Sequence, residues 1–142
     1  EKYLESKNYM AGKKLVVSDL LWGKLGMSIC YDLRFPNLYR KLTKKGAQFF
    51  SIPAAFTFTT GKAHWHSLIR ARAIENGCFV FAPAQCGVHD NGRRTYGHSM
   101  IVNPWGKILV EANKNKKQII STIINIDEIG NSRKKIPSMT QF

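Results

Sequence analysis

Short apolar runs, separated by polar residues, glycines and prolines, predict strands along most of this chain. These runs lie at 15–17, 24–30, 47–55, 78–85, 96–102, 107–112 and 117–126. A turn through Ser18, Asp19 and the Trp22-Gly23 pair is expected between the first two strands. The last three runs follow one another closely and predict consecutive antiparallel strands that close the sheet.

Helical patterns interrupt these runs. The segment 36–45 begins with Pro36, which suits a first helical turn, and ends before Gly46. A second helix is expected at 62–76, with Thr60 as a candidate N-cap and Gly77 as the stop. Residues 126–137 predict a terminal helix or tail. Strands that alternate with helices before a β-meander indicate a layered α/β domain with a mixed sheet.

Composition agrees with a folded core but adds an unusual charge. The chain has 142 residues, of which 44% are hydrophobic, so it is long enough to bury a core. Lys and Arg number 22 against 9 acidic residues, which gives a net charge of +13. A charge of this size suggests a polyanion as a partner. The basic residues gather at expected helix ends and turns without interleaved aromatics, so solvated surface is favoured over a nucleic-acid interface.

The number of cysteines and the length of the longest apolar stretch indicate where in the cell the protein is expected. Three cysteines, an odd number, favour a reducing compartment, and we expect a cytoplasmic protein. The longest apolar stretch, 47–58, is interrupted by polar residues and is shorter than the ~20 residues of a membrane-spanning helix. We therefore expect neither a membrane nor a nucleic acid as partner, although a salt-sensitive basic nucleic-acid binder remains an alternative.

Cys30 is the first candidate for chemistry. It ends an expected strand and precedes a helix, a junction that can hold a nucleophilic thiol rigidly beside backbone N–H groups. A cysteine at the end of an apolar strand is more often a small buried hydrophobe, and Cys78 and Cys86 fit that interpretation better still.

The histidines do not predict a metal site. His64 and His66 are two residues apart in an expected helix and so point to different faces, and neither His89 nor His98 belongs to a ligand-spaced pair. We expect His66 and His98 to pack or to form hydrogen bonds, and we expect no metal and no cofactor.

Four ordered motifs resemble the nitrilase superfamily of carbon-nitrogen hydrolases: LESKNYMAG, GMSICYDLRFPNLYR, TGKAHWHSLIRARAIEN and YGHSMIVNPWG. The sequences of these motifs most resemble the branch that contains deaminated glutathione amidase and ω-amidase. The resemblance implies a four-layer α-β-β-α sandwich and association into dimers or larger assemblies. It implies Cys30 as the nucleophile, the backbone N–H of Tyr31 in the oxyanion hole, and Glu5 as a second Glu that orders the site.

The same resemblance implies hydrolysis of a linear amide through a Cys thioester, on a deaminated glutathione-like or ω-amide substrate. In the family, a general-base Glu and a catalytic Lys precede the Glu5 segment. Residues 1–142 are therefore expected to form a partial domain, roughly the C-terminal half of the sandwich, which is inactive alone. The missing N-terminal half is a candidate partner of this chain. A non-catalytic subunit or interaction module is the alternative. The branch often has Glu after Trp65, where this chain has His66.

Other polar residues receive weaker expectations. Asp32 and Arg34 are expected to brace the turn after Cys30 by hydrogen bonds or an ion pair, and Glu75 to pair with Arg72 on one helix. Residues 103–106 (NPWG) predict a hairpin turn. A substrate carboxylate could be bound by one of four arginines, which could equally be surface charge: Arg70, Arg72, Arg93 and Arg94.

Overall fold

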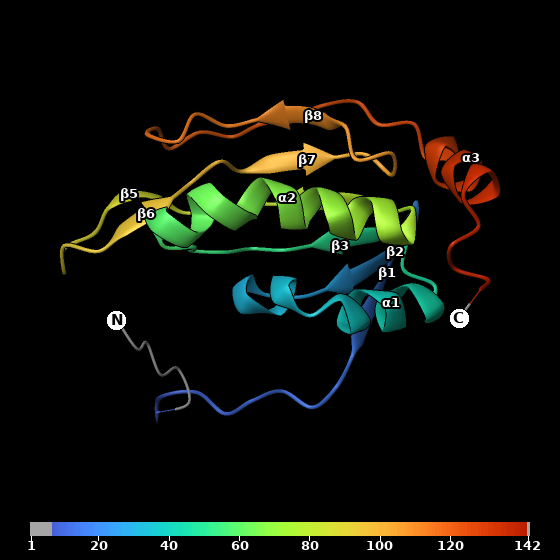
Figure 1. Ribbon diagram of the computed structural model, residues 1–142, viewed down its shortest axis with the longest axis horizontal. Coiled ribbons are helices and arrows are strands. Elements are labelled where there is room, and N and C mark those ends of the chain that lie inside the picture. The colour runs from blue at the N-terminus through green and yellow to red at the C-terminus, as the bar shows by residue number, and fades with distance from the viewer. Residues whose placement is uncertain (1–6, 142) are drawn as a thin grey trace.

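The computed structural model describes residues 7–141 and has a mixed α/β architecture (Figure 1). The elements in chain order are β1 (Val16–Leu20), β2 (Gly23–Met27), the 3₁₀ helix η2 (Cys30–Arg34), α1 (Pro36–Lys44), β3 (Phe49–Ser51), α2 (Phe58–Asn76), β4 (Phe79–Ala82), β5 (Cys86–Val88), β6 (Arg94–Tyr96), β7 (Met100–Val102), β8 (Ile108–Glu111) and α3 (Asp127–Lys135).

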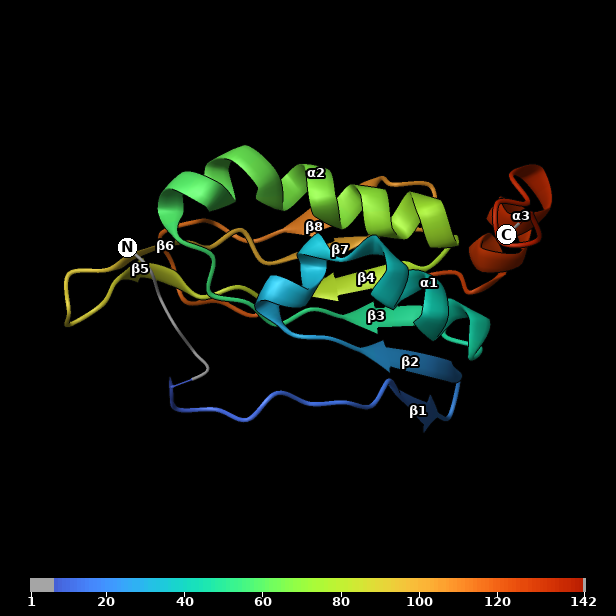
Figure 2. The same cartoon turned by 60° about the horizontal axis from the view of Figure 1, so that its bottom comes forward.

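Most strands join one six-stranded sheet in the order β1-β2-β3-β4-β7-β8. The central strands β2, β3 and β4 are parallel, and antiparallel neighbours flank them on both sides. Parallel neighbours require crossover connections, which α1 and α2 supply. Both helices lie on the same face of the sheet (Figure 2). A separate hairpin, β5-β6, extends beyond the sheet.

Alternation along the short central strands creates two cores. In β3, Phe50 joins the cluster beneath the helices, which includes the fully buried Trp65 and Ile69 of α2. Phe49 points to the opposite face, where it packs with Phe79 of β4 and Ile129 of α3. Consecutive phenylalanines in one strand are thus buried on both faces, as the apolar run at 47–55 predicts.

The helices follow their expected positions with shifted ends. α1 begins at Pro36 as expected. α2 ends at Asn76, and the expected stop at Gly77 is confirmed, since Gly77 is the C-cap with a left-handed φ of 57°. The helix begins at Phe58 with Thr57 as N-cap, so the expected start near Lys62 with Thr60 as cap is wrong. α3 confirms the terminal helix and carries acidic residues in its first turn and basic residues in its last.

Several strand predictions need correction. Ser18 and Asp19 belong to β1, because they pair with Leu25 and Lys24 of β2, and Lys24 Nζ forms an ion pair with Asp19 at 2.8 Å. The expected strand at 117–126 is wrong: residues 117–125 form no strand, and both Ile119 and Ile123 are 98% exposed. The hairpin β5-β6 was not expected. Its strands are too short for a clear alternating pattern.

Within residues 7–141, no helix combines the length and the apolar character that crossing a bilayer requires.

Candidate active site

Cys30 lies where the chain leaves β2 and enters η2. Its N–H donates to the carbonyl of Pro53 at 2.8 Å, and its φ is 47°. A left-handed conformation is unfavourable for a residue with a side chain, and such strained positions cluster at functional sites. The strand-to-helix junction expected for Cys30 is confirmed, and its turn is sharper than the sequence predicts.

Side-chain bonds hold the turn around Cys30. Asp32 accepts a hydrogen bond from the N–H of Ile29 at 2.8 Å, which confirms the bracing role expected for Asp32. Arg34 makes a different contact from the one expected, since its guanidinium lies 3.2 Å from His64 Nδ1 and 5.1 Å from the ring centroid of Phe56. Among the described residues, no ion pair joins Asp32 to Arg34.

Arg72 of α2 supports this turn through the carbonyl of Leu33. Its Nε and one terminal nitrogen donate to the carbonyl of Leu33 at 3.0 and 2.8 Å, and it forms the expected pair with Glu75 at 3.2 Å. The side chain of Arg72 is only 5% exposed. Both roles considered from the sequence, a substrate contact and a surface charge, are therefore wrong for Arg72: it fastens η2 to α2.

The other three arginines also have defined neighbours. Arg70 donates to the carbonyl of Gly106 at 2.8 Å, and Arg94 lies over the ring of Phe58 at 3.9 Å. Arg93 donates to the carbonyl of Ala55 at 3.0 Å. Of the four arginines, Arg93 is thus the one bonded to a residue that borders the Cys30 pocket.

A pocket of about 570 Å³ opens beside Cys30, lined by Ile29, Cys30, Pro53, Ala54, Ala55, Pro83, Ala84, Gln85 and Ser99. These residues follow the carboxyl ends of the parallel strands β2, β3 and β4, together with Ser99 just before β7. Ligands of open α/β sheets bind at that edge. Ser99 Oγ closes the wall by accepting from the N–H of Ala84 at 2.8 Å.

The lining places the Cys30 thiol in a wall whose described part has no basic or acidic side chain. Within the described part of the chain, the pocket wall contains no carboxylate, lysine or histidine. The backbone N–H of Tyr31 follows Cys30 directly, at the first turn of η2, where helix N–H groups have no acceptor inside the helix. Glu5, the other residue expected at the site, lies outside the described residues.

The remaining cysteines differ from each other. Cys78 is fully buried, as expected, and burial raises the pKa of its thiol despite the nearby Arg133 guanidinium. Cys86 is only partly buried, so the interpretation of Cys86 as a buried hydrophobe is wrong.

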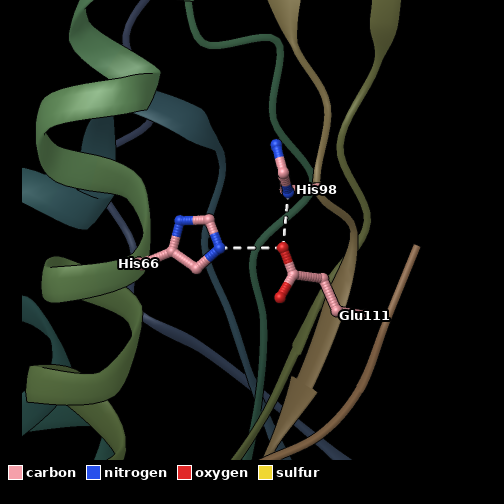
Figure 3. Close-up of side chains that lie close together, drawn as sticks. All are labelled: His66, His98 and Glu111. Carbon is pink, nitrogen blue, oxygen red and sulfur yellow. Dashed lines mark hydrogen bonds and ion pairs between the residues drawn. The ribbon is translucent and has the colours of Figure 1, made fainter. Parts of the chain in front are cut away.

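A second polar cluster was missed by sequence reasoning. His66 of α2 and His98, which precedes β7, both contact the carboxylate of Glu111 at the end of β8 (Figure 3). Hydrogen bonding of both histidines is as expected, but their meeting at one carboxylate is not. The spacings of His66, His98 and Glu111 along the chain match no metal-ligand motif. The sheet and α2 bring the three residues together.

These features define a class of protein: an α/β fold with a cysteine held in a strained turn at the carboxyl edge of its parallel strands. Residues 1–134 match the family model described as carbon-nitrogen hydrolase, and the chain belongs to that family.

Known proteins agree with this assignment. The chain is 50% identical to a deaminated glutathione amidase of Synechocystis over 139 residues, covering 96% of this chain and 51% of the relative. The structure of Saccharomyces cerevisiae Nit3, of the nitrilase superfamily, matches with a TM-score of 0.89 at 36% identity, over 96% of this chain and 50% of Nit3. An amidase from Nesterenkonia, solved with acrylamide added at its active-site cysteine, matches with a TM-score of 0.71 at 29% identity, over 78% of this chain and 43% of the amidase.

The expected nitrilase-type α/β fold is thereby confirmed. The chain spans about half the length of the Synechocystis relative.

Proposed function

We propose that Cys30 is the nucleophile of a hydrolase that cleaves the carbon-nitrogen bond of a small linear amide. The observation that carries this proposal is the position of Cys30, in a left-handed turn that borders a pocket at the carboxyl edge of β2, β3 and β4. The Cys30 thiolate attacks the amide carbonyl carbon, the carbon-nitrogen bond breaks, and the leaving amine takes a proton. Water then hydrolyses the thioester to the carboxylic acid and regenerates the thiol.

Oxyanion stabilisation and proton transfer are assigned to groups around Cys30. The backbone N–H of Tyr31 stabilises the oxyanion that forms on the attacked carbonyl. The general base is a carboxylate from outside residues 7–141, since the described wall of the pocket offers none. By family resemblance this base is a Glu that acts with a Lys, and Glu5 orders the site.

The substrate is proposed to be deaminated glutathione or a related ω-amide with a free carboxylate. The supporting observations are the name of the Synechocystis relative and Arg93, which is bonded to the pocket residue Ala55. A guanidinium pairs well with a carboxylate. We further propose a cytoplasmic, homo-oligomeric protein without a nucleic-acid partner.

The experiment measures formation of the carboxylic acid and release of the leaving amine by the natural gene product that contains these residues, with deaminated glutathione and with a neutral amide of similar length. We expect faster release from the carboxylate-bearing amide, loss of activity in Cys30→Ala, and retained activity in the matched variant Cys86→Ala. Full activity of Cys30→Ala would disprove the assignment of Cys30 as the nucleophile. Equal rates on both amides would disprove the carboxylate contact alone.

The second candidate function is a non-catalytic subunit or interaction module. It is favoured by the pocket wall, whose described residues include no proton acceptor. The 142-residue chain, assayed alone, separates two situations. We expect no turnover from it, because the described wall of its pocket offers the thiol no base; turnover that disappears in Cys30→Ala would show that the chain carries a complete site. A natural gene product that hydrolyses neither amide would favour the module.

A further inference from the structure

We propose that His66, His98 and Glu111 bind one divalent metal ion of the zinc class. One ligand atom from each residue lies within 4.8 Å of the other two. The three residues come from different elements, α2, the turn before β7 and the end of β8, so the fold gathers them. The proposal is independent of hydrolase activity, because none of the three lines the Cys30 pocket.

The donor atoms face one another. His66 Nε2 lies 2.8 Å from Glu111 Oε1, and His98 Nδ1 contacts the same oxygen (Figure 3). Two imidazole nitrogens and a carboxylate oxygen therefore converge on one small volume. Imidazole with carboxylate suits Zn²⁺, Co²⁺ and Ni²⁺, whereas Mg²⁺ and Ca²⁺ prefer ligands that are all oxygen.

The supporting structure fixes both histidines. His98 has a φ of 61°, a left-handed and strained conformation, and its carbonyl accepts a hydrogen bond from Trp65 Nε1 at 2.9 Å. Trp65 is fully buried and directly precedes His66, so one anchored residue positions both ligands. The ring of Tyr96 packs 4.3 Å from His98 and 5.9 Å from His66, measured between centroids. Locked ligands of this kind are what a metal site requires.

An ion can reach the cluster and complete its coordination there. The side chains of His66, His98 and Glu111 are 32%, 19% and 31% exposed, and His98 borders a cavity of about 550 Å³. Three protein ligands with an accessible fourth position form an open zinc site, in contrast to the closed four-ligand structural type. The cavity shares Ala84, Gln85 and Ser99 with the wall of the Cys30 pocket, so the proposed ion lies beside that pocket without entering it.

The test uses the 142-residue chain, stripped with a chelator and titrated with Zn²⁺ against a chromophoric competitor and with Co²⁺ by visible absorption. We expect one ion per chain and a Co²⁺ spectrum without a thiolate charge-transfer band. His66→Ala and Glu111→Gln should weaken Zn²⁺ binding by more than ~100-fold, because even outer partners of metal ligands are worth ~10- to 100-fold. His64→Ala, from the same helix, and Cys30→Ala should leave binding unchanged.

A second measurement on the unmutated chain guards against variants that fail to fold. In long-range ¹H–¹⁵N spectra, Zn²⁺ should shift the imidazole signals of His66 and His98 and leave those of His64 and His89 in place. Absence of binding, equal binding by His66→Ala and the unmutated chain, or imidazole shifts confined to His64 or His89 would each overturn the proposal. The remaining interpretation would then be a carboxylate that orders two histidines without an ion.

Discussion

Replacement of Arg72 by Met should loosen the turn that carries Cys30. The buried guanidinium donates two hydrogen bonds to the carbonyl of Leu33 and pairs with Glu75. It also lies 5.5 Å from the ring centroid of Tyr39. Methionine fills a similar volume and keeps the helix, but it leaves the Leu33 carbonyl without these donors.

The magnitude follows from those contacts. Each hydrogen bond to a charged group contributes about 1.5–3 kcal/mol. Removal of the desolvation cost of a buried guanidinium returns part of that stability, so we expect a net loss of about 3 kcal/mol in the free energy of unfolding. For a chain of this size, that corresponds to a fall of about 10 °C in melting temperature.

Urea denaturation followed by tryptophan fluorescence measures the change, with thermal melts as a second readout. Arg72→Lys should lose less than Arg72→Met, since lysine keeps the charge but cannot repeat the fork geometry. Lys62→Ala, an exposed cation in the same helix, should change stability by no more than about 0.5 kcal/mol. A loss in Arg72→Met as small as that in Lys62→Ala would refute the assignment of Arg72 as an anchor.

Three further predictions concern buried groups. Burial raises the pKa of Tyr39 above its ordinary value of 10.0, so above pH 10 the folded state keeps a proton that the unfolded state loses. The free energy of unfolding, measured by urea denaturation, should therefore fall above pH 10, and it should fall less steeply in Tyr39→Phe. Burial also raises the pKa of the Cys78 thiol, so mass spectrometry should find Cys78 unalkylated by iodoacetamide until denaturant is added, and modification in the native chain would contradict this. Gly61→Ala should lower the free energy of unfolding by about 1–3 kcal/mol, because the added Cβ would lie 2.3 Å from Tyr96 Cβ. Gly130→Ala, where the added Cβ meets no atom within 4 Å, should raise it by about 0.5–1 kcal/mol. Equal thermal shifts in the two variants would contradict the packing argument.

Local chemistry made several features predictable from sequence. Pro36 and Gly77 bound their helices because a fixed φ suits a first turn and a left-handed φ suits a helix stop. The consecutive phenylalanines at 49 and 50 are buried on opposite faces because side chains alternate along a strand. Ordered motifs identified the family, and with it Cys30 as the candidate nucleophile.

Features that depend on distant partners were not predictable. The segment 117–126 has the apolar content of a strand, but residues 117–125 form no strand. Strand formation also needs backbone partners on a neighbouring strand, which apolar content does not encode. Arg72 has the sequence context of a surface cation, yet the carbonyl of Leu33 lies against α2 and draws it inward.

The α/β class, the main helices and the cysteine at the junction after β2 were therefore predictable from the chain alone. Those depend on periodicity, glycine and proline conformation, and motif order, all of which are local. The folded arrangement was needed to find the strained backbone at Cys30, the pocket wall beside it and the contact of His66 with Glu111. These depend on which strands and helices become neighbours, and spacing along the chain does not encode the distances between them.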